Sequence, residues 1–388
     1  MATNPVYLDY NATTPVAPEV ADAIEPYLRE HFGNPSSSHI YGQRAKLAVE
    51  KARGEVATLI GAQPEEIIFT GCATEANNLA ILGAARALGG KKHLITSAVE
   101  HPSVMQPILR LRDEGWEVSI LPVDSTGRVD PHAVERALRP DTALVSVMHA
   151  NNEVGTIQPI AEIARLTRPR GILLHSDAAQ STGKIEVNVE HLGVDLLTLA
   201  GHKFYAPKGV GALFVRAATQ IASILAGAEH EHGLRPGTEN VPFIVALGSA
   251  ARLAHSHLPR AQVRLKALRD QLHLQLLSEI PHLVLNGHPE ARLPNTLNLS
   301  FPGVTGHDLL GAAASEVAAS TGSACHSGEH TASGVLGAMG ASKERAAGAV
   351  RLSLGTYTTS IEISRAAQAL ISAWKQLHTS LYSISISR

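Results

Sequence analysis

Two segments place a charged side chain directly after a run of apolar residues. Lys203 follows Leu196 to Leu199 and lies beside glycine, histidine and aromatic residues. Such a position removes water from the amine, which lowers its pKa and makes it nucleophilic. Most lysines are solvated surface charges, so Lys203 alone does not identify a site. Asp177 ends another apolar run, where it could hold a positive charge or serve as a helix N-cap, which is the commoner use.

A third segment, from Thr70 to Thr74, leads from an apolar run through small residues into a helical pattern. Free backbone N–H groups and a threonine hydroxyl at a helix start suit a phosphate, but an ordinary cap at Thr74 explains the same residues equally well. In this order the three segments supply what pyridoxal phosphate requires. They offer an anion cradle, a carboxylate for the pyridinium nitrogen and an amine for a Schiff base.

The chain has 2 cysteines, too few for a disulfide framework, so each is either a small apolar residue or a reactive thiol. Cys325 lies in the small and polar segment 321–330, which we expect to be a mobile loop. Three polar neighbours favour its thiolate: His326, Ser327 and His330. Cys72 lies in the tight turn before Thr74, where we expect a small residue that simply fits.

These residues need a scaffold that brings strand ends together. From about residue 60, short β-branched runs alternate with amphipathic stretches, and a glycine or proline marks each change. The alternation predicts an α/β fold with a mainly parallel, seven-stranded sheet covered on both faces, whose ligands bind beyond the carboxyl ends of the strands. The predicted strands are Ile67–Thr70, His93–Thr96, Val118–Val123, Leu144–Met148, Ile172–His175, Leu196–Leu199 and Gly211–Val215, with helices at Thr74–Ala87, Val104–Asp113, Pro131–Leu138 and Ile160–Leu166.

After about Val241 the pattern changes to long helices and short strands, which predicts a smaller α+β domain. We expect a large domain over residues 15–258 and a small domain from 1–14 and 259–388 that carries the Cys325 loop. Residues 381–388 are expected to fray. The elements predicted here are helices through Leu253, at Arg260–Leu277 and at Ile361–His378, and strands at Leu283–Leu285, Thr296–Ser300 and Val350–Ser353.

Composition excludes several classes of protein. The 388 residues are 44% hydrophobic and 18% charged, which is an ordinary globular balance. A net charge of −2 provides no basic field for nucleic acid or an anionic membrane. No stretch approaches the roughly 18 apolar residues of a membrane span, and the first residues do not resemble a signal peptide. We therefore expect a cytoplasmic protein.

Ordered motifs along nearly the whole chain resemble the cysteine desulfurases, which are fold-type I pyridoxal-phosphate enzymes grouped with the class V aminotransferases. Such a resemblance implies a large domain with a mainly parallel sheet and a small α+β domain. The matching segments are Tyr7–Pro15, Gly33–Ser37, Ala73–Glu75, Glu100–His101, Asn151–Gly155, Asp177–Gln180, Gly201–Lys203, Arg235–Thr238, Gly322–Cys325 and Arg351–Gly355.

The resemblance implies a role for each residue that holds the cofactor. Lys203 would form the Schiff base and later move the substrate α-proton, and Asp177 would keep the pyridine nitrogen protonated. His101 would cover the ring face and could also act as an acid or base, whereas the other nineteen histidines could simply be packed residues. Gln180 and Asn152 would bond the phenolate oxygen of the cofactor or hold the substrate, and Ala73, Thr74 and His202 would cradle the phosphate. Thr238 would reach the phosphate of a neighbouring subunit, which implies a homodimer.

The resemblance also implies the substrate and the reaction. L-cysteine would lose its sulfur to the Cys325 thiolate, leaving an enzyme persulfide and L-alanine. The persulfide would then donate its sulfur to an acceptor protein, for iron-sulfur cluster assembly or another thiolation. Arg351 would grip the substrate carboxylate with its guanidinium fork, although a structural salt bridge is a competing role. The other implied substrate contacts are Asn11, Asn34 and Asn152.

Three features depart from the family pattern. Ala200 replaces a phosphate-binding serine found in many members, at a cost of ~1.5–3 kcal/mol at most. The run from Gly227 to Gly233 replaces a more glycine-rich stretch near the dimer contact and the mouth of the site. The sequence has no extended tail after its last helix of the kind that some members use to dock a scaffold, which leaves the sulfur acceptor open.

Several alternative functions remain at this stage. Selenocysteine lyase, in the same family, releases selenium by similar chemistry, and Ala200 and the Ala-Cys-His-Ser run are somewhat like it. A plain aminotransferase would not need Cys325, and a scaffold without catalysis would not need the complete set of site residues. Spacing also allows His230 and His232 to chelate a metal from one face of a strand, but no further ligands are evident. We expect no metal and a solvated loop there.

Overall fold

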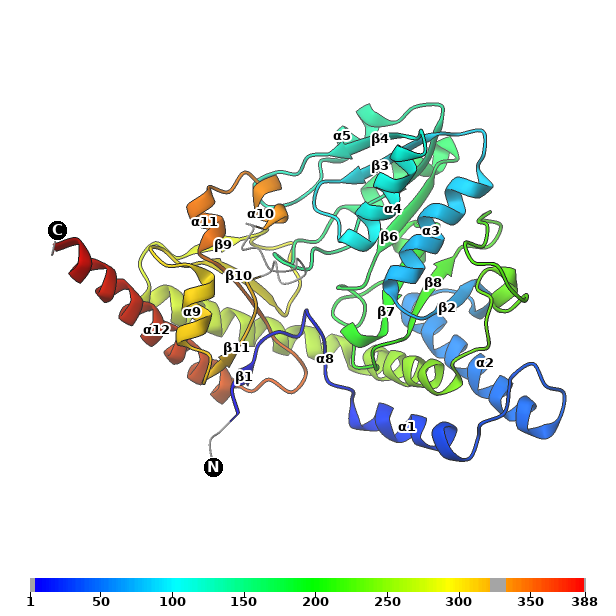
Figure 1. The fold of residues 1–388 in the computed structure, drawn as a ribbon, viewed down its shortest axis with the longest axis horizontal. Coiled ribbons are helices and arrows are strands. Elements are labelled where there is room, and N and C mark those ends of the chain that lie inside the picture. Colours follow the sequence, from blue (N-terminus) through cyan, green and yellow to red (C-terminus); the bar gives the residue numbers. More distant parts are fainter. Residues whose placement is uncertain (1–3, 322–332, 387–388) are drawn as a thin grey trace.

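The computed structural model describes residues 4–321 and 333–386. Its main sheet has seven strands in the order β2-β8-β7-β6-β5-β3-β4 (Figure 1). Only β8 runs antiparallel to its neighbours, so the predicted mainly parallel sheet is confirmed. The strands are β2 (Ile67–Thr70), β3 (His93–Ser97), β4 (Glu117–Leu121), β5 (Thr142–Ser146), β6 (Leu173–Asp177), β7 (Leu196–Ala200) and β8 (Gly211–Val215).

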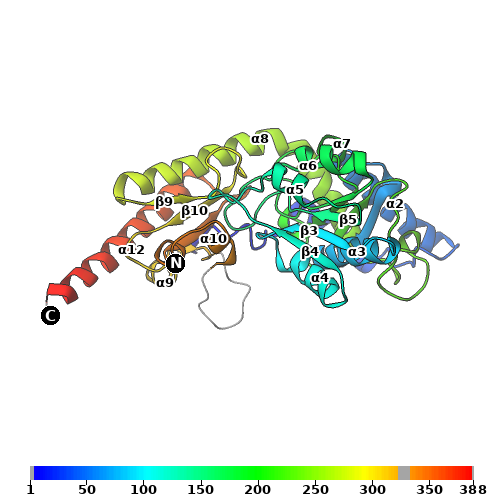
Figure 2. The ribbon, with the colours of Figure 1, turned by 90° about the horizontal axis from the view of Figure 1, so that it is seen from above.

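Alternating side chains along these strands build one apolar core on each face of the sheet. Ile68 and Leu94 pack under α3 (Ala73–Ala87) and α4 (Pro102–Asp113), whereas Ile67 and Ile95 face the opposite side. Figure 2 shows the two layers of helices with the sheet between them. The helices of the second layer are α2 (Ile40–Ile60), α5 (Pro131–Ala137), α6 (Ile160–Thr167), α7 (Val189–Leu192) and the start of α8 (Val241–Glu279), and α1 (Pro18–Arg29) packs on α8.

A smaller body forms around an antiparallel sheet of β12 (Ala349–Ser353), β10 (Thr296–Ser300) and β9 (Val284–Asn286). A two-stranded parallel sheet pairs β1 (Val6–Tyr7) with β11 (Val317–Ala318), which brings the start of the chain beside this body. Its helices are α9 (Gly306–Ala312), α10 (Gly334–Ala338), α11 (Lys343–Ala347) and α12 (Ser360–Ile386). Among the described residues, no helix is long and apolar enough to cross a membrane.

Two predictions for the helices were wrong. The helices expected on either side of residue 259 are one continuous helix, α8, which contains Pro259 and joins both bodies (Figure 1). Apolar packing before Pro259 against α2 and after it against α12 offsets the ~3 kcal/mol cost of an internal proline. The expected domain boundary between residues 258 and 259 thus falls inside this helix. The predicted fraying from residue 381 is also wrong, because α12 continues to Ile386 through a segment without glycine or proline.

Candidate active site

A cavity of about 320 Å³ opens at the carboxyl ends of β6 and β7, where the sheet topology predicts a ligand site. It is closed by the start of α3, the start of α4 and residues from the N-terminal segment and β12. Most of the residues predicted from sequence converge here. The predicted residues that line it are Asn11, Ala73, Thr74, His101, Asn152, Asp177, Gln180, His202, Lys203 and Arg351.

Lys203 lies at the end of a short turn, Gly201–Lys203, that directly follows β7. Its Nζ donates hydrogen bonds to the backbone oxygens of Asn11 at 2.7 Å and Ala12 at 2.8 Å. Gly201 is required at the start of this turn, because a Cβ there would lie 2.9 Å from the oxygen of Val210. The turn thus presents the amine to the cavity while the N-terminal segment holds it.

Asp177 fixes the turn after β6 and lines the cavity. Its Oδ1 accepts from the backbone N–H of Ala179 at 2.8 Å, which fixes the turn after β6, and its side chain also lines the cavity. Its Oδ2 accepts from the amide Nδ2 of Asn77 at 2.8 Å. The carboxylate is therefore buried and held in place from two sides.

A chain of hydrogen bonds connects this carboxylate with His101. The Asn77 amide also donates to Ser103 Oγ at 2.8 Å, and Ser103 Oγ lies 2.8 Å from His101 Nδ1. The backbone N–H of Ser103 donates to the same Nδ1, so this nitrogen is an acceptor and the imidazole proton is on Nε2. Burial lowers the pKa of His101, Asp177 raises it and Lys203 lowers it, with a net decrease. His101 is accordingly neutral at neutral pH.

Sequence reasoning missed Asn77 and Ser103. Asn77 is fully buried in α3, where the other buried residues are apolar or glycine, and Ser103 follows the cap residue His101 by two positions. A polar residue on an apolar helix face was the available signal, but the sequence does not say which partner it meets.

The end of the cavity at α3 is built from backbone. The helix begins at Ala73 with Cys72 as N-cap, so the alternative of Thr74 as an ordinary N-cap is wrong. Cys72 makes no side-chain cap, and N–H groups in the first turn of a helix have no partner inside it. Burial, assisted by nearby lysines, lowers the pKa of His202 to about 4. His202 can therefore hold an anion there as a neutral hydrogen-bond donor.

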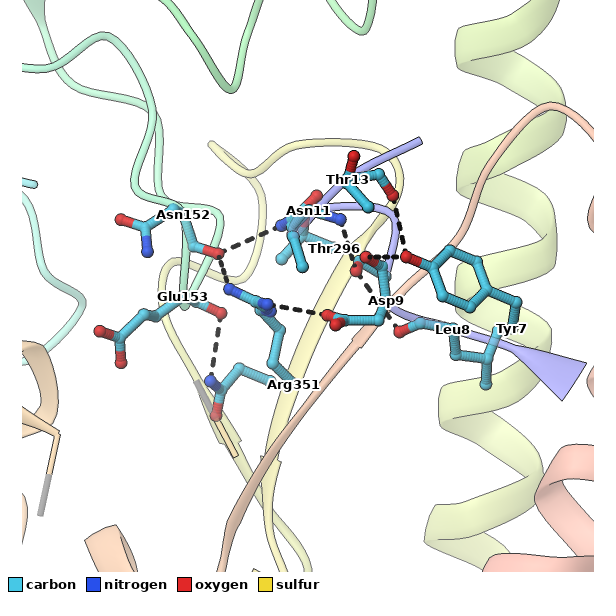
Figure 3. A network of polar contacts seen from close by, with 12 residues as sticks. Tyr7, Leu8, Asp9, Asn11, Thr13, Asn152, Glu153, Thr296 and Arg351 are labelled. Carbon is cyan, nitrogen blue, oxygen red and sulfur yellow. Dashed lines mark hydrogen bonds and ion pairs between the residues drawn. The ribbon is translucent and has the colours of Figure 1, made fainter. Parts of the chain in front are cut away.

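Arg351 enters the cavity from β12 and makes an ion pair, which is the alternative role that the sequence left open. Its Nη2 lies 2.8 Å from Asp9 Oδ1, and its Nη1 donates to the backbone oxygen of Asn152 at 3.1 Å (Figure 3). The side chain is only 6% exposed, and its Nε has no hydrogen-bond partner within the described part of the chain. Asn11 donates to the same Asn152 oxygen and to Thr296.

Two predicted residues of the described part of the chain do not line this cavity, and a third lies outside the described residues. Asn34 lies in the loop between α1 and α2, where its Oδ1 accepts from the backbone N–H of Ser36 at 2.9 Å. Thr238 is exposed in the loop before α8. Cys325 lies outside the described residues, within 322–332. Any contact of Asn34 or Thr238 with an active site therefore has to come from a second chain or a different loop position.

The expectation of a solvated loop at residues 227–233 is wrong for Glu231. Its carboxylate is buried and pairs with both Nη atoms of Arg53, at 2.9 and 2.8 Å. It also accepts from the backbone N–H of Phe69 at 2.7 Å, while Arg53 donates to Ile67, so the pair occupies the outer edge of β2. The run forms a short 3₁₀ turn with positive φ at Glu231 and His232, not the strand that a chelating histidine pair would need.

Breaking this pair is expected to destabilise the fold. The substitution Glu231→Gln leaves Arg53 buried without a counter-charge, so the free energy of unfolding should fall by about 3 kcal/mol. Urea denaturation followed by circular dichroism measures it. The neighbouring exposed residue gives a matched control, because Glu229→Gln should change stability by less than about 0.5 kcal/mol. Equal effects of the two substitutions would contradict the structural role.

Comparison with known proteins agrees with this geometry. The family model described as aminotransferase class-V matches residues 6–366. Cysteine desulfurase IscS of Dictyoglomus turgidum is 46% identical over 376 residues, covering 96% of this chain and 95% of the relative. The chain belongs to the cysteine desulfurase family of class-V aminotransferases.

Solved structures of this family have the same fold. A NifS-like protein superposes with a TM-score of 0.89 at 37% identity, and the alignment covers 95% of this chain and 98% of the NifS-like chain. A structure described as SspA in complex with cysteine superposes with a TM-score of 0.81 at 36% identity, covering 92% and 100% of the two chains. These likenesses extend over both bodies of the fold.

Proposed function

We propose that this protein is a pyridoxal-phosphate-dependent cysteine desulfurase that converts L-cysteine to L-alanine and transfers the sulfur to Cys325. The observation that carries the proposal is the convergence of Lys203, Asp177 and the uncapped start of α3 on one cavity. Its relative from D. turgidum is named for this activity, and the similar SspA structure is described with cysteine.

The residues present fit pyridoxal phosphate. A cavity of about 320 Å³ is of the size that small cofactors occupy. Backbone N–H groups at the start of α3, with Thr74 and His202, provide donors for the phosphate at one end. Asp177 provides a buried carboxylate for the pyridinium nitrogen, and Lys203 provides the amine.

Pyridoxal phosphate, when bound, supplies an electron sink for bond breaking at the substrate α-carbon. Lys203 removes the α-proton at Nζ and returns a proton later, and the carbonyls of Asn11 and Ala12 hold its amine when it is not engaged. His101, with its proton on Nε2 and Nδ1 held by Ser103, would cover the cofactor and present Nε2–H as a hydrogen-bond donor.

Arg351, Asn152 and Asn11 form the substrate end of the proposed site. The guanidinium binds the carboxylate of L-cysteine and either keeps its ion pair with Asp9 or gives it up when the substrate binds. The Asn11 amide is held in one orientation, since its Nδ2 donates to Asn152 and Thr296. These contacts orient the substrate before any proton moves.

Cys325 completes the reaction in this proposal. Its thiolate attacks the sulfur of the substrate, and a sulfur–sulfur bond forms as the carbon–sulfur bond breaks. The electron pair of the broken bond stays on the carbon skeleton, which takes up a proton and leaves as alanine. The persulfide then passes its outer sulfur to an acceptor protein, for iron-sulfur cluster assembly or another thiolation.

We further propose that the enzyme is a cytoplasmic homodimer. Thr238 and Asn34 lie outside the cavity of their own chain, as residues that serve a partner's site would. Large apolar side chains are exposed on α1, α2 and the loop between them, which supports an interface there. They are Leu28, Phe32, Ile40, Tyr41 and Leu47.

The direct test is alanine formation by the pyridoxal-phosphate-loaded protein, with L-cysteine and L-selenocysteine supplied in parallel. We expect turnover of L-cysteine with stoichiometric sulfur release in the presence of a thiol. Turnover of selenocysteine alone would replace the proposal by selenocysteine lyase. Absence of alanine from both substrates would reject the catalytic assignment.

A further inference from the structure

A second lysine, Lys184, is buried beside the cavity and belongs to none of the roles described above. It follows the Asp177–Gln180 turn and is 7% exposed. Its Nζ donates to Gln180 Oε1 at 2.8 Å and to Asn11 Oδ1 at 3.2 Å. Both acceptors are neutral amides, and no carboxylate of the described residues pairs with this amine.

Burying an amine in this environment costs folding free energy, so its presence indicates a functional role. Burial lowers the pKa of Lys184 well below its usual range, and the charges of Lys203 and Arg351 lower it further. A methionine of similar length would fill the same space without the desolvation penalty. The position of the amine between two amides of the site indicates what it does.

The hydrogen bonds of Lys184 determine which way the Gln180 amide points. Asn11 presents its Oδ1 to Lys184, because its Nδ2 is already engaged and the Asn295 amide also donates to this Oδ1. Lys184 therefore donates to two oxygen atoms, which either protonation state of an amine can do. With Oε1 of Gln180 fixed by Lys184, Nε2 becomes the outward donor, and it reaches the backbone oxygen of Asn11 at 3.0 Å.

We propose that Lys184 is a positioning residue that holds the Gln180 amide with its Nε2 toward the cavity, where this group donates to the phenolic oxygen of pyridoxal phosphate. The inference rests on the proposed function, since it assumes that this cofactor binds beside Gln180. Without Lys184 only the contact of Nε2 with the Asn11 carbonyl orients this amide, so the rotated amide, whose oxygen faces an oxygen of the cofactor, becomes more populated.

The test is a pH titration of the cofactor's visible absorption, which reports its protonation without any turnover. Loss of a donor to the phenolic oxygen destabilises the form in which that oxygen is negative and accepts, so Lys184→Met should move the titration midpoint upward by roughly one pH unit. The other charged or titratable groups at the cavity are unchanged in the variant. They are Cys72, His101, Asp177, His202, Lys203 and Arg351.

A double-mutant cycle separates orientation from charge. Gln180→Leu should raise the midpoint by a similar amount, and adding Lys184→Met in that background should change it by less than about 0.2 pH units. A shift that persists in the Gln180→Leu background would show that Lys184 acts through its charge and would overturn the inference. An unchanged midpoint in Lys184→Met alone would overturn it as well.

Two further results keep the outcome interpretable. Should Lys184→Met fail to fold, Lys184→Gln replaces it in the cycle. A glutamine amide can point either its oxygen or its nitrogen toward Gln180, so it orients Gln180 less strongly than the lysine does. We then expect a smaller upward shift of the titration midpoint. A folded wild type that gains no visible absorption after loading would reject the proposed function and this inference together. Visible absorption in the wild type with no shift in the variants would reject this inference alone.

Discussion

Replacing Lys203 with alanine is expected to lower alanine formation from L-cysteine by about 10⁴-fold or more. The variant loses the covalent attachment of the cofactor and the group that moves the α-proton, and no neighbouring side chain among the described residues can replace it. His101 has a lowered pKa but is anchored through Nδ1, and the amine of Lys184 is held by two amides. Alanine formation measures the rate, and mass spectrometry after borohydride reduction measures covalent attachment.

A matched control distinguishes this role from a general effect of removing a lysine. Lys208 is exposed in the same segment, and Lys208→Ala should retain both the covalently trapped cofactor and most of the activity. The cofactor should still bind Lys203→Ala without a covalent bond, because the start of α3 and Asp177 are intact. A trapped cofactor on any other lysine of this variant would contradict the assignment.

Much of the fold could be predicted because the parallel strands are buried on both faces and appear as continuous apolar runs. All seven strands of the main sheet were located, with ends displaced by at most two residues. The long helix α8 could not be predicted, since Pro259 is a strong local signal for a break. Packing against α1, α2 and α12, which are distant in sequence, keeps the helix continuous.

The candidate site shows the same division. Lys203 and Asp177 could be found because each follows a strand and the sheet brings strand ends to one edge. The connection of Asp177 to His101 through Asn77 and Ser103 could not, because side-chain hydrogen bonds between three elements leave no pattern along the chain. Glu231 was misjudged for the related reason that its partner, Arg53, is far away in sequence.

Replacing Cys325 with alanine is expected to lower alanine formation from L-cysteine by about 10³-fold or more, because no sulfur acceptor would remain on the enzyme. The change in cofactor absorption on adding L-cysteine should persist, since Lys203, Asp177 and Arg351 still bind and deprotonate the substrate. Rapid alanine quantification and a stopped-flow absorption record measure the two effects. Loss of the absorption change would instead indicate that Cys325 acts in substrate binding.

Cys72 is the competing acceptor that this experiment has to address. The structure places it at the rim of the same cavity with an exposed thiol, so proximity alone does not exclude it. Its position as N-cap of α3 fixes its backbone in the proposed phosphate end, away from the substrate end at Arg351. We therefore expect alkylation and mass spectrometry to find the persulfide on Cys325 in both the wild type and Cys72→Ala. A persulfide on Cys72 in the wild type would transfer the acceptor role to the phosphate end of the cavity and contradict the geometry proposed for the substrate.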